Sequence, residues 1–510
     1  MRGLGAVARW LKEHFPTLWR TAKVVVMLAV GLAILAAVAA IVLDIYGSQR
    51  LAAAKKEAAA RGLRLSTDQV LADPEARTPN MSNAANYYEA AFAVLSVKGV
   101  LSRQPTVPLA GAESSPGMDR SGKERFERDM KRLEEDPRLP LPEYMLRDAK
   151  EFLAERQIAL DLIAEGYGLP DSRYHVHWQG YSTLMPHLTK VRAAERIMAL
   201  AAWVDAEENR PHEASATIRQ GLALARSLRN EPALIAALVE MAGVSISLSQ
   251  GLTRVVARTQ VSDEDLKALQ ADIENDAETL SVRTAYEGEL AMFCDFVDSI
   301  IDGRMTLAES LWSVRNPGAT GGVRRWLQRR GILNLATTWL IKGYLKADEA
   351  NAIRWHVRMS EHLDDPGPAF LSDPSREFEE FSGGPYILSR MMLPALSGGV
   401  EQCELTRARL RSAAAVLAAL RFKRDTGKWP AMLDDLVPKY LSKVPIDPTT
   451  GLPLVYVVRE DGILVYSVGE NASDDGGKPY LVKPARGDTK GYDDVGFRLF
   501  TGKTQAGSTQ

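Results

Sequence analysis

Hydrophobic positions follow three patterns along this chain, and each pattern predicts a different kind of structure. An unbroken run from Val24 to Leu43 contains only Val, Met, Leu, Ala, Ile and one Gly, and Lys23 and Asp44 bound it. About twenty helical residues cover the roughly 30 Å of a bilayer's hydrocarbon core, where a helix satisfies its own backbone hydrogen bonds. The run therefore predicts a transmembrane helix over residues 24–43.

A cleaved signal peptide is the alternative for this run, with a cleavage site at Ala37-Val38-Ala39. Cleavage there would leave the apolar residues Ile41, Val42 and Leu43 at the start of the mature chain. Signal peptides also have a shorter apolar core and a shorter charged region than the 23 residues that precede this run. Both features favour an uncleaved signal-anchor.

The segment 1–23 has apolar residues at helical spacing, with Trp10 and Trp19 among them and Arg or Lys elsewhere. This pattern is typical of an amphipathic helix in the membrane interface, and a docking helix for a partner protein is the alternative. Basic residues are equally numerous before and after the run, but Arg20 and Lys23 lie closest to it. The positive-inside rule then favours a cytoplasmic N-terminus in the cell inner membrane, with the bulk of the chain periplasmic or otherwise extracytoplasmic.

The second pattern is helical periodicity. Residues 44–122 predict a juxtamembrane helix that ends near Gly62, a short helix over Asn83–Leu95, and a Pro-, Gly- and Ser-rich linker at Gln104–Gly122. Residues 123–400 predict an α-helical domain. Its clearest apolar stripe comprises Leu188, Val191, Ala194, Ile197, Met198, Ala201 and Val204.

Turn chemistry divides this predicted domain into helices. Pro211 follows a polar turn, Pro232 is a first-turn proline for a helix that extends through Val255, and Ser262 with Asp265 resembles a capping box. Helix pairs with tight turns resemble the units of helical-repeat proteins, but no signature recurs at a fixed period. The expected fold class is therefore mainly α, with an irregular or solenoid-like helical domain behind one transmembrane helix.

The third pattern, alternation typical of β-strands, appears in residues 401–500. A helix over Glu401–Asp425 precedes two β-rich runs, Leu454–Val458 and Ile463–Val468, which a four-residue hairpin signal joins. Gly496–Phe500 is a candidate third strand. These residues predict a small α+β module containing a β-hairpin, and residues 501–510 predict a flexible tail.

This C-terminal module resembles the C-terminal half of the major pseudopilins of type II secretion. That family has a helix, a Gly-x-[Tyr/Trp]-Pro turn, a proline-containing acidic turn, a strand pair and a calcium-binding loop. The matching positions are Gly427, Trp429, Pro430, Asp447, Pro448, Gly451, Pro453, Tyr456, Ser467, Gly469 and Asp475. The resemblance implies the strand pair and an acidic loop that holds calcium.

The chain also departs from that family. Pseudopilins carry their apolar helix directly before the module and begin with a prepilin-peptidase site, whereas here more than three hundred residues separate the two. The chain as a whole is similar to families of single-pass bacterial membrane proteins, which share the Asn-Ala-Ala-x-x-Tyr motif at Asn83–Tyr88, a helical middle and this ending. Neither resemblance implies an enzymatic activity.

Composition limits the remaining possibilities. A chain of 510 residues is expected to form two or more folded units, and a net charge of −2 gives no general attraction for nucleic acid. Basic residues at 324–330 lie beside apolar ones, which is typical of a solvated helix face. Cys294 and Cys403 are too few for a disulfide framework, so we expect buried thiols, with a single bridge as the alternative.

Known catalytic motifs are missing from the sequence: it contains no His-Glu-x-x-His, Cys-x-x-Cys, Gly-x-Ser-x-Gly or Walker phosphate loop. His175, His177 and His187 form a local cluster that zinc could use if His175 and His177 lay on a strand, but surface or structural histidines also explain it. The acidic C-terminal loop is the best ligand candidate. Asp474 and Asp475 supply the hard oxygen donors that calcium prefers, and a solvated loop is the alternative.

Three functions remain open. The leading hypothesis is a non-enzymatic, membrane-anchored envelope protein whose helical scaffold binds other proteins, with the lipid bilayer and other envelope proteins as partners. The second is an accessory component of a secretion or pilus-like machine. The third is an enzyme, such as a hydrolase, whose site is assembled from residues far apart in sequence.

Overall fold

The computed structural model describes residues 16–71, 82–96, 120–305, 331–364, 366–372, 381, 386–477 and 494–501. Most of these residues are helical. The helices are α2 (Pro16–Ala60), α3 (Thr67–Leu71), α4 (Ala84–Leu95), α5 (Arg120–Glu135), α6 (Glu143–Ala154), α7 (Gln157–Gly166), α8 (Pro186–Glu207), α9 (Pro211–Arg226), α10 (Leu234–Ser245), the π-helix η3 (Ile246–Leu252), α11 (Thr253–Arg258), α12 (Asp263–Thr279), α13 (Arg283–Ile301), α16 (Gly331–Met359), α17 (Gly367–Ser372), α19 (Ile387–Thr426) and the 3-10 helix η4 (Leu433–Leu436). The strands are β1 (Val455–Arg459), β2 (Gly462–Ser467) and β3 (Val495–Phe500). The predicted segment 1–15, the linker at 104–119 and the tail at 502–510 lie outside the described residues.

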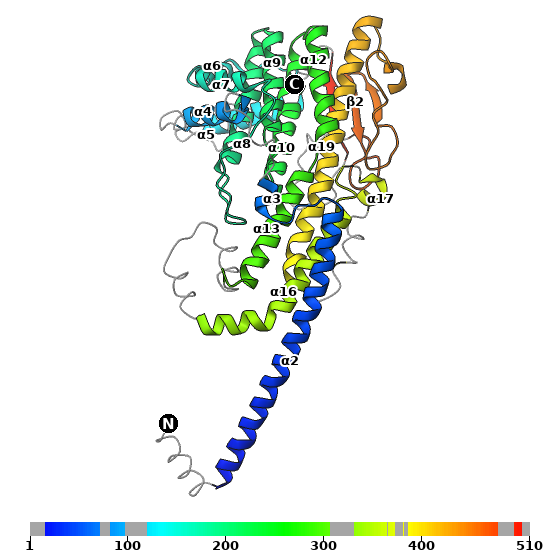
Figure 1. The fold of residues 1–510 in the computed structure, drawn as a ribbon. Coiled ribbons are helices and arrows are strands. Elements are labelled where there is room, and N and C mark those ends of the chain that lie inside the picture. The colour runs from blue at the N-terminus through cyan, green and yellow to red at the C-terminus, as the bar shows by residue number, and fades with distance from the viewer. Residues whose placement is uncertain are drawn as a thin grey trace.

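Helix α2 contains the whole apolar run and continues beyond it without a break, for 45 residues in all. Figure 1 shows its first half projecting away from the rest of the protein. The apolar side chains there are exposed, for example Leu28 at 68% and Leu32 at 69%. Helix α2 is thus long and apolar enough to cross a membrane, as the sequence predicts. The segment Leu234–Arg258 is also long and apolar enough, although it is shorter and less apolar, and it is mostly buried in the helical domain.

The second half of α2 packs against α16, and the two backbones touch where they cross. A Cβ atom placed on Gly47 would lie 2.1 Å from the carbonyl oxygen of Gly343, so only glycine permits this approach. Beside the crossing, the Lys346 ammonium contacts the Asp44 carboxylate at 2.7 Å. Further along, the Lys55 ammonium lies 2.9 Å from the buried carboxylate of Glu349. The second half of helix α2 is therefore packed as part of the domain.

Helices α4 to α13 form the middle of the protein. All seven residues of the stripe predicted on α8 are buried. The predicted cap at Ser262 is present, because its side chain accepts a hydrogen bond from the Asp265 backbone at the start of α12. The helix expected from Pro232 through Val255 begins at Leu234 and contains the π-helical turn η3.

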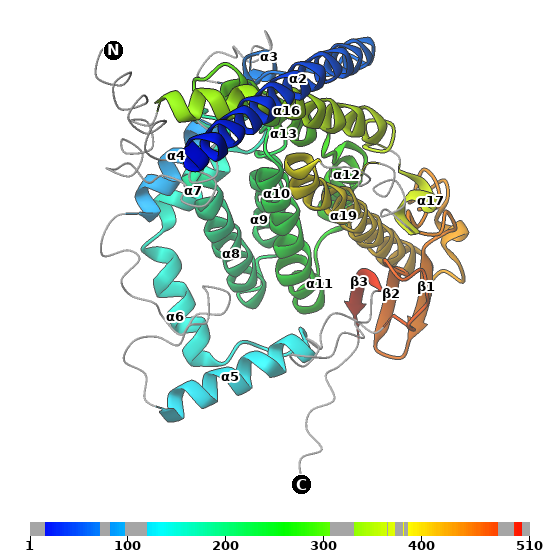
Figure 2. The same cartoon turned by 90° about the horizontal axis from the view of Figure 1, so that it is seen from below.

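Neighbouring helices pack in sequence order, as α8 does on α9 and α9 on α10. Helix α19, however, comes from far along the chain and packs on both α10 and α12. In a solenoid each unit contacts only its neighbours, so this long-range packing gives the domain a different organisation. Figure 2 shows α19 beside these helices, with the sheet near one of its ends.

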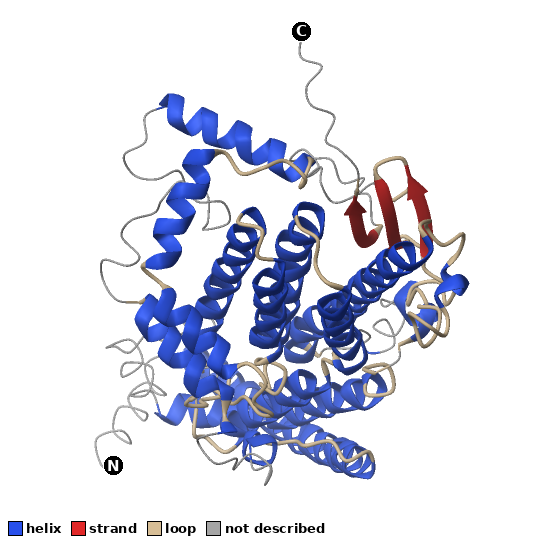
Figure 3. Ribbon diagram, turned by 90° about the horizontal axis from the view of Figure 1, so that it is seen from above, coloured by secondary structure: helices blue, strands red, loops and turns tan. Residues whose placement is uncertain are grey.

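The three strands form one antiparallel sheet in the order β1-β2-β3. A two-residue turn joins β1 to β2, with Arg459 opposite Gly462, and β3 pairs with β2 so that Phe500 also lies opposite Gly462. These pairings confirm the predicted hairpin and the third strand. Figure 3 shows the sheet at one edge of the otherwise helical protein.

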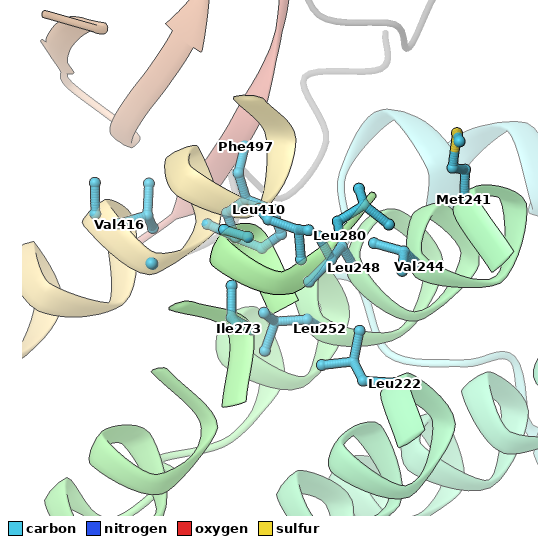
Figure 4. Packing of buried hydrophobic residues seen from close by; sticks show 14 of the residues in the cluster. Leu222, Met241, Val244, Leu248, Leu252, Ile273, Leu280, Leu410, Val416 and Phe497 are labelled. Atoms are coloured by element: carbon cyan, nitrogen blue, oxygen red, sulfur yellow. The ribbon is translucent and has the colours of Figure 1, made fainter. Parts of the chain in front are cut away.

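Helix α19 begins at Ile387 rather than at Glu401 and ends at Gly427, which adopts a left-handed conformation with φ of 79°. Its side chains Leu410, Ala414 and Leu417 are buried in one cluster with residues of α9 to α12 on one side and of the sheet on the other. Figure 4 shows Leu410, Leu248 and Phe497 from these different parts within the same core. The expected boundary between residues 400 and 401 therefore falls inside a continuous helix and a continuous core.

The two cysteines are both free thiols, and both are buried. Cys294 belongs to a small cluster between α2, α13 and α16, whereas Cys403 belongs to the main core. The expectation of buried thiols is confirmed, and burial raises the pKa of each thiol.

Candidate ligand-binding cleft

A cleft of about 540 Å³ lies between helix α5, the η3–α11 segment and strands β2 and β3. Cavities of a few hundred cubic ångströms are typical of small-ligand and peptide-segment sites. Four aromatic side chains and three arginines are among its lining residues: Trp203, Tyr466, Phe497, Phe500, Arg254, Arg409 and Arg498.

Arg254 forms the floor of the cleft and is almost fully buried. Its guanidinium contacts a Glu207 carboxylate oxygen at 2.7 Å and donates to the backbone carbonyl of Leu139, also at 2.7 Å. It lies 4.7 Å above the Trp203 ring. Burial lowers the pKa of Arg254, and Glu207 opposes this shift. A buried charge needs such partners, so Arg254 fixes the connection after α5 against α8.

The helical wall contains the π-helix η3. A π-helical turn carries an extra residue, rotates the side chains that follow it, and is often found at functional sites. In η3, the Gln250 side-chain carbonyl oxygen is buried and has no hydrogen-bond partner among the described residues. Buried acceptors without a partner are rare in folded proteins. Gln250 is also among the residues that line the cleft.

The sheet wall is held by polar contacts of its own. Arg498 contacts Asp461 at 2.6 Å and stacks 4.1 Å above the Phe500 ring. Asp494, just before β3, accepts hydrogen bonds from the backbone of Gly477 at 2.7 Å and of Asp475 at 3.3 Å. Burial raises the pKa of Asp494. The cleft thus combines aromatic surface with charged groups of both signs.

The predicted calcium ligands lie next to this wall but are engaged by their own loop. Asp474 accepts a hydrogen bond from the Tyr466 hydroxyl at 2.7 Å and from the Gly476 backbone at 2.8 Å. Asp475 accepts one from the Asn471 side chain at 3.1 Å. Over the described ranges, no three His, Cys, Asp or Glu side chains converge as metal ligands do. Asp488 and Asp493, two further acidic residues of the same C-terminal region, lie outside the described residues.

The histidine cluster is not brought together. Residues 172–178 form no strand, so the geometry expected for a His-x-His zinc site is absent from this described segment. His175 instead contacts Glu89 at 2.7 Å, and His187 is buried 2.9 Å from Glu231. Both histidines thus lie beside glutamates that are distant in the sequence, Glu89 on α4 and Glu231 in the connection before α10.

Two buried carboxyl groups were not predicted from the sequence, because charged side chains usually lie at the surface. Glu195 lies at the centre of the helical domain, where it accepts a hydrogen bond from Ser247 at 3.0 Å. Glycines 221 and 243 leave room for it, and burial raises its pKa well above the usual range. Burial also raises the pKa of Glu240 to about 7, although Arg229 lies 2.7 Å away. The only sequence signal was that both sit within strongly apolar helices.

Comparison with family models, with curated proteins and with solved structures finds no match to this chain. Arguments about function therefore depend on the geometry described above and on the motifs of the sequence.

Proposed function

We propose that this protein is a single-pass, membrane-anchored envelope protein whose helical domain is a scaffold that binds other proteins. In this proposal α2 spans the inner membrane, with the N-terminus in the cytoplasm and the domain on the other side. The exposed apolar surface of α2 between Val24 and Leu43 supports the anchor, because such a surface is unfavourable in water and favourable in lipid.

The observation that carries the proposal is the continuity of α2 from the apolar run into the domain core. Ala54 and Ala58 on its second half are fully buried against α13 and α16. A flexible tether would let the domain turn freely, whereas a continuous helix fixes both its height and its orientation above the bilayer. Fixed orientation serves a protein that holds a partner in a defined place.

The surface proposed for the partner is the cleft beside β3. A polypeptide segment could lie against the aromatic and arginine side chains that line the cleft. Aromatic and arginine side chains are enriched at protein interfaces, as they are here. Nucleic acid is not a proposed partner, since the net charge of the chain is −2.

Site-specific photo-crosslinking tests this assignment. A photoreactive amino acid replaces Ser249, an exposed residue that lines the cleft, in the full-length protein expressed in its own cells. The matched control carries the same group at Ile158, which is 66% exposed on α7 and is not among the lining residues of the cleft. Protein adducts at Ser249 but not at Ile158 are expected. The same adducts at both positions, or none at Ser249, would contradict the cleft as the partner site.

An enzyme remains a second candidate because of the unpartnered Gln250 oxygen in a π-helix, a feature shared with many catalytic and ligand sites. In that case a small molecule, rather than a protein, would occupy the cleft. A metabolite from cell extract that binds the native protein but not a Gln250→Leu variant, with no protein adducts at Ser249, would favour the enzyme.

An accessory role in a secretion or pilus-like machine is the third candidate, and its support is the resemblance of the C-terminal module to pseudopilins. Calcium binding at Asp474 and Asp475 belongs to the same proposal. Identification of the Ser249 adducts as secretion components would favour this role over a general scaffold.

A further inference from the structure

The position of α16 relative to α2 fixes which part of the domain lies closest to a bilayer. A Cβ atom on Gly343 would lie 2.2 Å from the Leu43 carbonyl carbon and 2.3 Å from the Asp44 nitrogen, so the two backbones are in contact. This contact coincides with the end of the apolar run. If that run fills the hydrocarbon core, α16 crosses α2 at the boundary between hydrocarbon and headgroups.

Large apolar side chains are exposed at the same level. Trp339 and Leu340, one turn before Gly343, are 48% and 40% exposed. Figure 1 shows the first turns of α16 running across the direction of α2, so they would lie along a membrane surface and not point into it. A helix in this orientation with tryptophan and leucine exposed is typical of the membrane interface.

The start of α19 adds to this surface. The Ile387 backbone donates a hydrogen bond to the Tyr344 hydroxyl at 2.7 Å, which holds the start of α19 beside the crossing. Ile387 and Met391 are 63% and 67% exposed. Scattered exposed apolar residues are ordinary, but a group of them on two helices at one level marks an interaction surface.

A cationic group lies just above these apolar residues. Arg50 donates to the hydroxyls of Tyr46 and Tyr386 at 2.8 Å and 2.7 Å. Among the described residues no carboxylate contacts its guanidinium. Arg50 lies seven residues beyond Leu43, about 10 Å along the helix. The headgroup layer is roughly 5–8 Å thick on each side, so the Arg50 side chain is within reach of lipid phosphates.

We propose that the end of the domain formed by the first turns of α16 and the start of α19 is itself a lipid-contacting surface. Trp339, Leu340 and Ile387 enter the interface of the phospholipid bilayer, and Arg50 binds headgroup phosphate. The inference rests on the proposed anchoring by α2, since α2 supplies the membrane position. It adds a second contact with the bilayer, which would stop the domain from tilting about its anchor.

Depth-dependent fluorescence quenching tests the inference in the full-length protein. Cys294 and Cys403 are first replaced by alanine, and single cysteines are then introduced at Leu340 or Ile387 and labelled with an environment-sensitive dye. Two reference positions are labelled in the same way: Val38, exposed on the apolar run, and Met432, exposed near the opposite end of α19. Each protein is reconstituted into phosphatidylcholine–phosphatidylglycerol vesicles, with and without lipids brominated near the top of the acyl chain.

The inference predicts that bromolipids quench the dye at Leu340 and Ile387 as they do at Val38, while the dye at Met432 keeps its full fluorescence. Quenching at Val38 alone, with Leu340 and Ile387 behaving like Met432, would overturn the lipid-contacting surface and leave the anchor intact. Absence of quenching at all four positions would overturn the anchor itself. Replacing Arg50 by Gln should reduce quenching at Ile387, and quenching that the substitution leaves unchanged would remove the proposed phosphate contact.

Discussion

Replacing Gly343 by alanine tests whether the close crossing of α2 and α16 holds the domain to its anchor. The new Cβ would lie 2.2–2.3 Å from backbone atoms of Leu43 and Asp44, whereas ordinary contact begins at 3.4 Å. Both obstructing groups are backbone atoms, and backbone atoms cannot relieve the overlap by a change of rotamer as a side chain can. The two helices must therefore separate by about 1 Å, which lengthens the contact between Lys346 and Asp44.

Two opposing effects determine how much the substitution changes the free energy of unfolding. Overpacking a close contact typically costs about 1–3 kcal/mol, and a backbone obstruction belongs at the upper end of that range. Alanine gains back about 1 kcal/mol over glycine in a helix interior. The expected result is a net loss of about 2 kcal/mol in the free energy of unfolding.

The assay is denaturant unfolding of the full-length protein in detergent micelles, compared with two control variants. Gly31 on the apolar run of α2 and Gly398 on α19 have no atom within 4 Å of a built Cβ. Their alanine variants should be as stable as the native protein or more stable, by up to about 1 kcal/mol. A Gly343→Ala variant as stable as these controls would refute the argument that the glycine crossing fixes the anchor.

Three further predictions follow from the core and the C-terminal loop. Burial raises the pKa of Glu240 from 4.5 to about 7, so its stabilising contribution is complete below about pH 4.5 and is lost as the pH rises through 7. The unfolding free energy of the native protein should fall more between pH 5 and pH 7 than that of Glu240→Gln, and parallel curves would contradict the assignment. Leu417→Asp should lower the free energy of unfolding by about 3–5 kcal/mol in the same denaturation assay, because it places a charge in the core shared by the helices and the sheet. Gln402→Asp, on the exposed face of α19, should lower it little. Equal losses in the two variants would contradict the shared core. If Asp474 and Asp475 bind calcium, the ion should raise the melting temperature above that measured with chelator, and magnesium should raise it less; identical melting curves would reduce both residues to ordinary loop positions.

Local patterns in the sequence predicted several of the individual helices and strands. The apolar run gave α2, the stripe from Leu188 to Val204 gave α8, and the cap at Ser262 gave the start of α12. These features depend on residues close together in the chain, where periodicity and capping chemistry are informative. The same holds for the β1–β2 hairpin, which its turn residues predict.

The sequence patterns did not predict which distant segments of the chain pack together. The crossing of Gly47 and Gly343 joins residues about three hundred positions apart, and a glycine alone gives no sign of its partner. The cleft combines parts of α5, η3 and β3, so no single segment carries its signature. Glu195 was missed for a different reason: a carboxyl group predicts a surface position unless its neighbours are known.

Cysteine accessibility along α2 tests the central claim, a domain fixed to the membrane by one helix and lying outside the cytoplasm. In a background without Cys294 and Cys403, single cysteines are placed at Thr17, Ile34, Gln49 and Met432, all on exposed positions. A membrane-impermeant maleimide is then added to cells whose outer membrane has been permeabilised. We predict labelling at Gln49 and Met432, labelling at Thr17 only after the inner membrane is opened, and no labelling at Ile34. Labelling at Thr17 with protection of Gln49 and Met432 would reverse the orientation, and labelling at all four positions in intact inner membranes would contradict the anchor.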